Sequence, residues 1–146
     1  MRDIKREINN VIDQCRIELL IISSAKLLNH LLLSSGFRVQ ISGLLKRGVS
    51  IRVLSNSIDT DIKTNFNFVN SLDLDSRIEY GVSNQLERFN ESILIADGRL
   101  MLRSILEPSN EIVAHISTEV SVVLVREILF EKYWNEIQSL EIASSN

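Results

Sequence analysis

The chain of 146 residues contains one cysteine, one proline and only five glycines. A single cysteine, Cys15, excludes an intrachain disulfide and a zinc site built from several cysteines, so we expect a reduced, partly buried thiol in a cytoplasmic protein. The scarcity of proline and glycine argues against a long flexible linker. The sequence therefore predicts one domain over 1–146, with an N-terminal helix over 1–14, a core over 15–138 and a tail over 141–146.

The sequence also lacks a long basic run and a long apolar run. Its formal net charge is −3 and its pI is about 5.4, and basic residues occur only in short clusters such as Lys46-Arg47. A nucleic-acid-binding surface is usually basic, so direct binding to nucleic acid is not expected. The apolar runs 17–22 and 120–125 are each broken by a polar residue and are far shorter than the roughly 20 residues that cross a bilayer. The charged start of the chain does not resemble a secretion signal, so we expect no membrane partner.

What the sequence does contain is an alternation of helical and strand patterns. Hydrophobic residues make up 45% and charged residues 24%, which is typical of a globular domain. Periodicity predicts helices over 3–14, 25–47 (with a break at Ser34-Ser35-Gly36), 59–72 and 119–140, and strands over 16–23, 49–54, 76–82, 93–96, 100–106 and 112–116. Asp97-Gly98-Arg99 lies between two apolar runs, which is a strong signal for a hairpin. This order predicts an α/β fold in which helices cover a mixed sheet.

Apolar side chains at helical spacing predict which helix faces are buried. The stripes are Leu27, Leu28, Leu31 and Leu32, then Val39, Ile41, Leu44 and Leu45, and in the closing helix Val122, Val125, Leu129, Tyr133 and Ile137. The aromatic set Phe130, Tyr133 and Trp134 is expected in the core rather than around a ligand. Arg52, on a predicted strand, either pairs with a carboxylate or faces a pocket, and the sequence does not decide between the two.

The motif stretch, residues 90–98 (Asn90-Glu-Ser92-Ile-Leu-Ile-Ala-Asp97-Gly98), carries the most chemical information. Its spacing is that of the H-x-K-x4-D motif of phosphodiesterases, with Asn90 in the position of the histidine and Ser92 in that of the lysine. Asparagine cannot attack phosphorus or carry a proton, and serine has no charge to balance a phosphate. Only Asp97 and the strand-and-turn frame remain. The sequence therefore predicts a phosphoryl-transfer scaffold without its nucleophile, and not an enzyme.

Other features occur in the order expected for that scaffold. They are the apolar strand 17–23, a helix end followed by Arg47-Gly-Val and a strand, the strand 77–82, the motif stretch, and Phe130-Glu-Lys-Tyr-Trp134 in the closing helix. Together they resemble the phospholipase D-like superfamily over roughly residues 15–138. They resemble most its non-catalytic members in archaea, namely the sensor domains attached to archaeal histidine kinases and the effector domains of TrmB-type transcriptional regulators.

This resemblance implies a pseudoenzyme: a catalytically inactive sensory or regulatory domain of an archaeal-type signal-transduction or transcription-control protein. In such relatives two units meet around a twofold axis, so a homodimer is expected, and an output domain or partner protein would receive the signal. Two alternatives stay open. One is a divergent phosphodiesterase or nuclease, and the other is a purely structural dimerisation module. No cofactor is expected.

The residues expected to bind a small-molecule or anionic ligand are Arg88, Asn90, Ser92, Asp97 and His115. Asn90 and Ser92 offer hydrogen-bond donors and acceptors without charge, and Arg88 would share their face if the strand began that early. The alternative is that Asn90 and Ser92 are polar residues at a strand end and that Asp97 only forms the turn. The two histidines of the chain lack the carboxylate spacing of a metal site, so none is expected.

Overall fold

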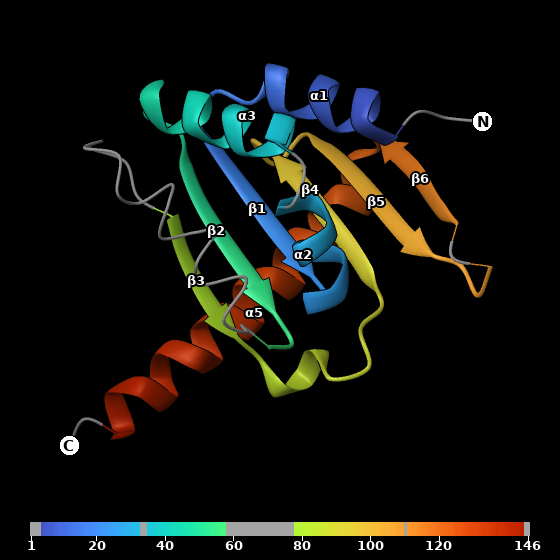
Figure 1. The fold of residues 1–146 in the computed structure, drawn as a ribbon. Helices are drawn as coiled ribbons and strands as arrows, with labels where there is room; N and C mark the ends of the chain where they lie inside the picture. Colours follow the sequence, from blue (N-terminus) through green and yellow to red (C-terminus); the bar gives the residue numbers. More distant parts are fainter. Residues whose placement is uncertain (1–3, 33–34, 58–77, 110, 145–146) are drawn as a thin grey trace.

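The computed structural model describes residues 4–32, 35–57, 78–109 and 111–144, and it contains a six-stranded mixed sheet with helices on both faces (Figure 1). The helices are α1 (Ile4–Gln14), α2 (Ala25–Leu32), α3 (Ser35–Lys46), the short 3-10 helix η1 (Asn84–Leu86) and α5 (Val120–Ser144). The strands are β1 (Glu18–Ser23), β2 (Ser50–Ser55), β3 (Ile78–Val82), β4 (Glu91–Ala96), β5 (Leu100–Leu106) and β6 (Ile112–Ser117). The prediction of an α/β fold with a mixed, helix-covered sheet is confirmed. The helix predicted over 59–72 lies outside the described residues.

The strands lie in the order β3-β2-β1-β4-β5-β6. β1, β2 and β3 are parallel, whereas β4 is antiparallel to β1 and β5 is antiparallel to both β4 and β6. Parallel neighbours need a crossover connection, which α2 and α3 provide between β1 and β2. The predicted hairpin joins β4 to β5, and its turn residues Asp97 and Gly98 have the positive φ values (56° and 66°) that such turns require.

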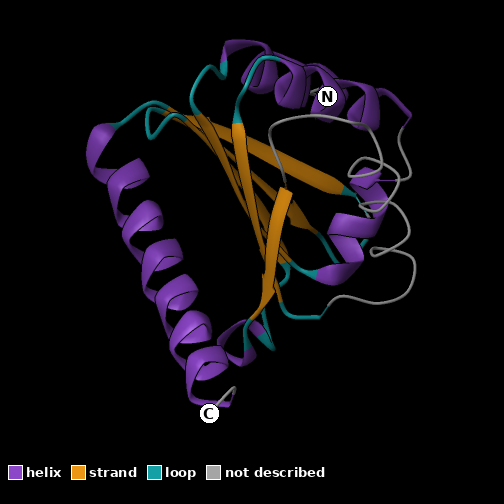
Figure 2. Cartoon of the chain, turned by 90° about the vertical axis from the view of Figure 1, so that its left-hand side faces the viewer, coloured by secondary structure: helices purple, strands orange, loops and turns teal. Residues whose placement is uncertain are grey.

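Helices α1, α2 and α3 cover one face of the sheet and α5 crosses the other, as Figure 2 shows. Successive strand residues point to opposite faces, so each central strand contributes to two cores. Leu19 and Ile21 of β1 join the cluster of α1, α2 and α3, whereas Leu20 and Ile22 join the cluster that contains Phe130 of α5. Burial on both faces explains why β1 is a continuous apolar run.

The buried side of α5 differs from the predicted stripe. Phe130 and Trp134 are buried and their rings stack with centroids 5.6 Å apart, which confirms the expected aromatic core. Val122 and Val125, however, are 37% and 57% exposed. Apolar residues in 120–125 occur at every phase of the helix, so this segment does not define which side faces the sheet. The large rings one to two turns later pack on the sheet and set the rotation of α5.

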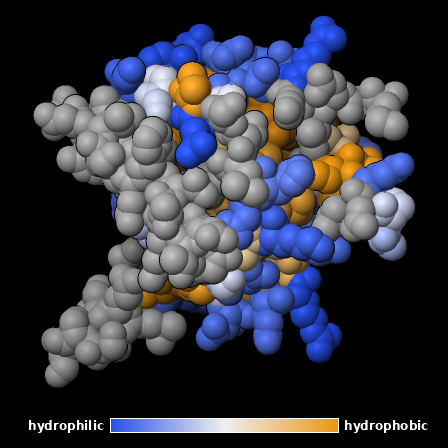
Figure 3. Space-filling model, in the orientation of Figure 1, coloured by the Kyte–Doolittle hydropathy of each residue, from blue (hydrophilic) through white to orange (hydrophobic). Residues whose placement is uncertain are grey.

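Among the residues that Figure 3 colours on the face that carries α1, α2 and α3, most are hydrophilic. Hydrophilic residues lie over α1 and α3 at the top and over α2 in the centre, and an apolar area lies over the β5–β6 side. In α3 the predicted stripe is partly wrong, because Val39 is 71% exposed while Ile41 and Leu44 are buried. Within the described ranges, no helix combines the length and apolar character that a membrane span requires.

Candidate functional site

Four buried serines form a row across the sheet, which we call the serine row. Ser55 of β2 is in register with Ser23 of β1, Ser23 with Ser92 of β4, and Ser92 with Ser104 of β5. Residues two positions away on each of these strands belong to the core shared with α1, α2 and α3, so the serines point to that face. Helix α2 contacts β4 on the same face.

Hydrogen bonding in the serine row is incomplete. The Ser23 hydroxyl donates to the carbonyl oxygen of Ser24 at 2.9 Å. The buried hydroxyls of Ser55 and Ser92 have no hydrogen-bond partner among the described residues. A buried unpaired hydroxyl costs about 1–3 kcal/mol. These two hydroxyls therefore do not stabilise the fold through hydrogen bonds to other described residues.

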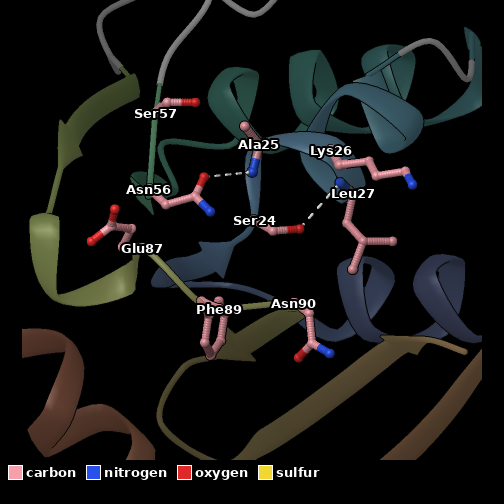
Figure 4. A pocket seen from close by; sticks show the side chains of 9 residues that line it. All are labelled: Ser24, Ala25, Lys26, Leu27, Asn56, Ser57, Glu87, Phe89 and Asn90. Carbon is pink, nitrogen blue, oxygen red and sulfur yellow. Dashed lines mark hydrogen bonds between the residues drawn. The ribbon is translucent and has the colours of Figure 1, made fainter. Parts of the chain in front are cut away.

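A pocket of about 380 Å³ lies beside the serine row, outside the carboxyl ends of β1 and β2 (Figure 4). Its wall comes from the start of α2 (Ser24 and Lys26), the end of β2 (Asn56) and the segment between η1 and β4 (Glu87, Phe89 and Asn90). Ser24 and Asn56 directly follow two members of the row. In open α/β sheets, ligands bind in the crevice outside the carboxyl ends of the strands.

Two hydrogen bonds fix the rim of the pocket at the start of α2. The Asn56 Oδ1 atom accepts from the backbone N–H of Ala25 at 3.0 Å, and the Ser24 Oγ atom accepts from that of Leu27 at 3.3 Å. Ser24 thereby caps the N-terminus of α2. Figure 4 shows both bonds, with Asn90 on the segment that leads into β4. The rim is held in place by these contacts without a bound molecule.

The pocket combines neutral hydrogen-bonding groups with one charge of each sign. The amides of Asn56 and Asn90 can both donate and accept, Lys26 is a cation and Glu87 is an anion. Figure 4 shows Lys26 and Glu87 on opposite sides of the pocket. The described lining residues include no histidine or cysteine. Within the described ranges, no cluster of histidine, cysteine or carboxylate side chains could hold a metal ion.

The structure brings only two of the five predicted ligand residues to this region. Asn90 lines the pocket, and Ser92 lies in the serine row. Arg88 lies in the turn after η1, because β4 begins only at Glu91. The condition under which Arg88 would share a strand face with Asn90 and Ser92, a strand that begins by residue 88, is therefore not met.

Asp97 lies at the far end of β4, separated from Asn90 by the six residues of that strand, or about 20 Å. Its carboxylate accepts hydrogen bonds from the backbone N–H groups of Arg16 (2.9 Å), Ile17 (2.7 Å) and Glu18 (3.0 Å). Burial by itself raises the pKa of Asp97, but the three N–H groups outweigh burial and hold this pKa below its ordinary range. Asp97 thus fastens the start of β1 to the β4–β5 turn, away from the pocket.

Cys15 lies beside Asp97 and is fully buried, more deeply than the partly buried thiol that the sequence led us to expect. Its thiol donates to the carbonyl oxygen of Glu18 (3.1 Å) and to Asp97 Oδ1 (3.6 Å). Burial, followed by the negative charge of Asp97, raises the pKa of Cys15 from 9.0 to about 12. The thiol is therefore protonated near neutral pH and is a poor nucleophile.

His115 lies on β6 on the face of the sheet that α5 crosses. It is in register with Arg103 of β5. Arg103 is in register with Ile93 of β4, which belongs to the hydrophobic cluster that contains Phe130 of α5. Arg103 forms an ion pair with Glu91, and His115 is exposed beside this pair. The structure therefore separates His115 from Asn90 and the pocket.

Arg52 pairs with carboxylates, which resolves the choice that the sequence left open. Its Nη1 atom donates to Glu131 Oε2 of α5 at 3.2 Å, and its Nη2 atom lies 3.5 Å from Glu18 Oε2 of β1. Its Cζ atom lies 5.1 Å from the ring centroid of Phe130 and 5.5 Å from that of Trp134. Arg52 therefore joins β1, β2 and α5 on the face opposite the pocket.

Sequence reasoning missed Lys26, Asn56, Glu87 and Phe89 as pocket residues. One signal could have found Asn56: it is polar and directly follows the carboxyl end of a buried strand. Comparison of the sequence with protein-family models and with curated proteins gives no match. The candidate site is therefore defined by its geometry.

Proposed function

We propose that this chain is a catalytically inactive, phospholipase D-like domain that binds a small polar molecule and serves as a sensory or regulatory domain in an archaeal-type signalling or transcription-control protein. The observation that carries the proposal is the pocket at the carboxyl ends of β1 and β2, which is lined by Asn90, the residue that the resemblance aligns with the histidine of the phosphodiesterase motif. Asn90 can bind a ligand through neutral hydrogen bonds but cannot attack phosphorus.

The way the motif stretch folds supports this scaffold. Ser92 lies on β4, and Asp97 lies in the hairpin turn that follows. The position that would hold the lysine is Ser92, which is buried in the serine row and carries no charge. A phosphodiester in this place would lack the paired cations that normally hold its oxygens.

The lining of the pocket favours a ligand that is neutral or carries both signs of charge. Asn56 and Asn90 would recognise hydroxyl, amide or carbonyl groups, and Lys26 and Glu87 would balance opposite charges on one molecule. Phe89 is half-buried and offers an apolar wall. Sugars, polyols and amino acids have this chemistry.

Ligand binding would act through α2. Asn56 and Ser24 tie the start of α2 to the ends of β2 and β1, and both side chains line the pocket. A molecule that strengthens or replaces these bonds stabilises one position of α2 relative to the sheet face that carries the serine row. The ligand shifts the equilibrium between two positions of α2 only if its affinity for the protein is higher when α2 is in one of them.

A thermal-shift screen followed by calorimetric titration tests this function. Sugars, polyols, amino acids, inorganic phosphate and nucleotides are added one at a time, and a true ligand raises the melting temperature by mass action. Asn90→Ala should weaken binding about tenfold, since it removes a polar contact to the ligand. Asn84→Ala is the matched control, because Asn84 is an exposed asparagine of η1 that is not among the lining residues. Equal loss of affinity in both variants, or no stabilising compound, would contradict the proposed site.

A second assay addresses the absence of catalysis. The protein is incubated with a chromogenic phosphodiester and with single-stranded DNA, and we expect no product above the background rate. Turnover that is present in the native protein and lost in Asn90→Ala would show that the domain is an enzyme.

A further inference from the structure

The pocket at the ends of β1 and β2 carries one positive and one negative side chain that do not neutralise each other. Lys26, in the first turn of α2, and Glu87, directly after η1, both line the pocket and are exposed. Neither forms an ion pair within the described ranges, whereas Arg52 and Arg103 do pair with carboxylates. Figure 4 shows Lys26 and Glu87 on opposite sides of the pocket. Both charges are therefore available to a bound molecule, at separate places.

The rest of the described lining carries no charge. The Oδ1 atom of Asn56 accepts from the N–H of Ala25, which leaves the Nδ2 group of Asn56 as a donor. Asn90 adds a second amide, and the half-buried ring of Phe89 adds an apolar wall. The volume of about 380 Å³ is near the lower end of the range of small-molecule sites, roughly 300–1,000 Å³. The pocket therefore suits a small molecule whose charged groups are met by Lys26 and Glu87.

Opposite charges in one pocket discriminate between classes of ligand. A simple anion is attracted by Lys26 and repelled by Glu87, a simple cation meets the reverse, and an uncharged molecule uses neither group. A molecule with one charge of each sign pairs with both side chains. Hydrogen bonds between charged partners are stronger than those between neutral ones, and the N-terminal end of a helix favours a negative charge. The carboxylate of such a molecule therefore belongs beside Lys26, at the start of α2.

We propose that the ligand of this pocket is a free α-amino acid, bound as a zwitterion with its carboxylate on Lys26 and its ammonium group on Glu87. This assignment rests on the proposed ligand-binding function and narrows it to one class of molecule. The side chain of the amino acid lies against Phe89 and within reach of the amides of Asn56 and Asn90. Because Lys26 belongs to α2 and Glu87 to the segment between η1 and β4, the ligand joins these two parts of the chain.

Calorimetric titration of the native protein tests the class of ligand. The standard amino acids are titrated one at a time, with sorbitol, inorganic phosphate and AMP as representatives of other classes. The amino acid that binds most tightly is then compared with its N-acetyl derivative, which lacks the positive charge, and with its methyl ester, which lacks the negative charge. Each derivative should bind about five- to tenfold more weakly, because it leaves one charge of the pocket unpaired and keeps the charge that the other repels.

Charge variants test which side chains bind the two groups. Lys26→Gln and Glu87→Gln should each weaken binding of the amino acid about three- to tenfold, and Lys26→Glu should weaken it further. The double variant Lys26→Glu/Glu87→Lys should recover affinity to within about threefold of the native protein, because the zwitterion then binds in the reverse orientation. Circular dichroism checks that each variant is folded.

The matched controls are Lys46→Gln and Glu111→Gln, which remove exposed charges that are not among the lining residues and should leave affinity unchanged. Binding of sorbitol, phosphate or AMP that is lost in Asn90→Ala, without binding of any amino acid, would overturn this assignment and leave the proposed binding function standing. No binding by any compound would overturn both. An amino acid that binds Lys26→Gln and Glu87→Gln as tightly as the two controls would overturn the roles of these side chains.

Discussion

Asn90 and Asp97 belong to one sequence motif, yet the six residues of β4 separate them in space. Asn90 lines the pocket at one end of the sheet, and Asp97 binds three backbone N–H groups at the other end. In this protein, the two residues of the motif therefore have different tasks. Asn90 lines the pocket in which the proposed ligand would bind, and Asp97 connects the β4–β5 turn to the start of β1.

Asp97 should be one of the most sensitive positions for stability. Asp97→Ala leaves the N–H groups of Arg16, Ile17 and Glu18 without an acceptor and places alanine at a positive φ, so we expect a loss of about 2–4 kcal/mol in the free energy of unfolding. Asp97→Asn keeps the Oδ1 acceptor that serves Ile17 and Glu18, and asparagine tolerates positive φ, so it should lose less. Urea unfolding of the two variants measures the difference. Equal losses would show that the Oδ1 acceptor retained in Asp97→Asn does not stabilise the fold.

Cys15 should make stability depend on alkaline pH. Its pKa is about 12 in the folded protein against an ordinary value of 9.0, so the unfolded chain loses the thiol proton first as pH rises. The contribution of the protonated thiol is fully present below pH 9 and is lost as pH rises towards 12. The urea midpoint of the native protein should therefore fall more steeply above pH 9 than that of Cys15→Ala. Parallel slopes for the two proteins would contradict this role of Cys15.

The same burial predicts low reactivity of Cys15. Iodoacetamide attacks the thiolate, so native protein should react slowly at pH 8 and unfolded protein rapidly. Mass spectrometry of the alkylated chain measures both rates. Fast alkylation of the native protein would mean that the thiol is accessible.

Local sequence patterns were sufficient to predict most elements of the fold. Alternation and apolar runs located β1 and the β4–β5 hairpin, because those signals depend on neighbouring residues alone. The rotation of α5 was mispredicted, since its apolar start 120–125 has no single buried face and the rings of Phe130 and Trp134 decide it through tertiary packing. The partners of Asp97 were invisible in the sequence, because Ile17 lies 80 positions away.

The candidate site was harder to predict than the fold, for a related reason. Asn90 was found because it interrupts a known motif, but Asn56 enters the pocket only through the parallel register of β1 and β2. Arg88 was a candidate only if the strand began by residue 88, and β4 begins at Glu91. Which polar residues share a site depends on where strands begin and how they pair, and a single sequence gives both only approximately.

The serine row offers a test of whether the position of Ser92 has room for a lysine side chain. Ser92 is 1% exposed and its hydroxyl has no partner among the described residues, so Ser92→Ala should leave stability unchanged or raise it by up to about 1 kcal/mol. Ser92→Lys would bury a long cation without a partner beneath α2 and should cost more than about 3 kcal/mol. Thermal melting followed by circular dichroism measures both changes. A stable Ser92→Lys variant would show that α2 can move aside.

Arg52 connects β1 and β2, the strands beside the pocket, to α5, so its replacement should affect both the stability of the protein and the fluorescence of Trp134. Its guanidinium contacts Glu131 with two nitrogen–oxygen pairs and lies 5.5 Å from the ring centroid of Trp134. Lysine keeps the positive charge but cannot form the bidentate contact with Glu131 or stack on the rings of Phe130 and Trp134 as a guanidinium does. Arg52→Lys should therefore lower the free energy of unfolding by about 1 kcal/mol. Trp134 is the only tryptophan, so its emission reports directly on this contact and should shift in the folded variant.

The control for Arg52→Lys is Arg99→Lys, because Arg99 is exposed in the β4–β5 turn and should change neither quantity. Unaltered emission and an unaltered urea midpoint in Arg52→Lys would mean that any positive charge at this position is sufficient. A shift in both would show that the planar guanidinium holds α5 on β1 and β2. In that case ligand binding at the strand ends should also alter Trp134 emission in the native protein, and the response should be smaller in Arg52→Lys.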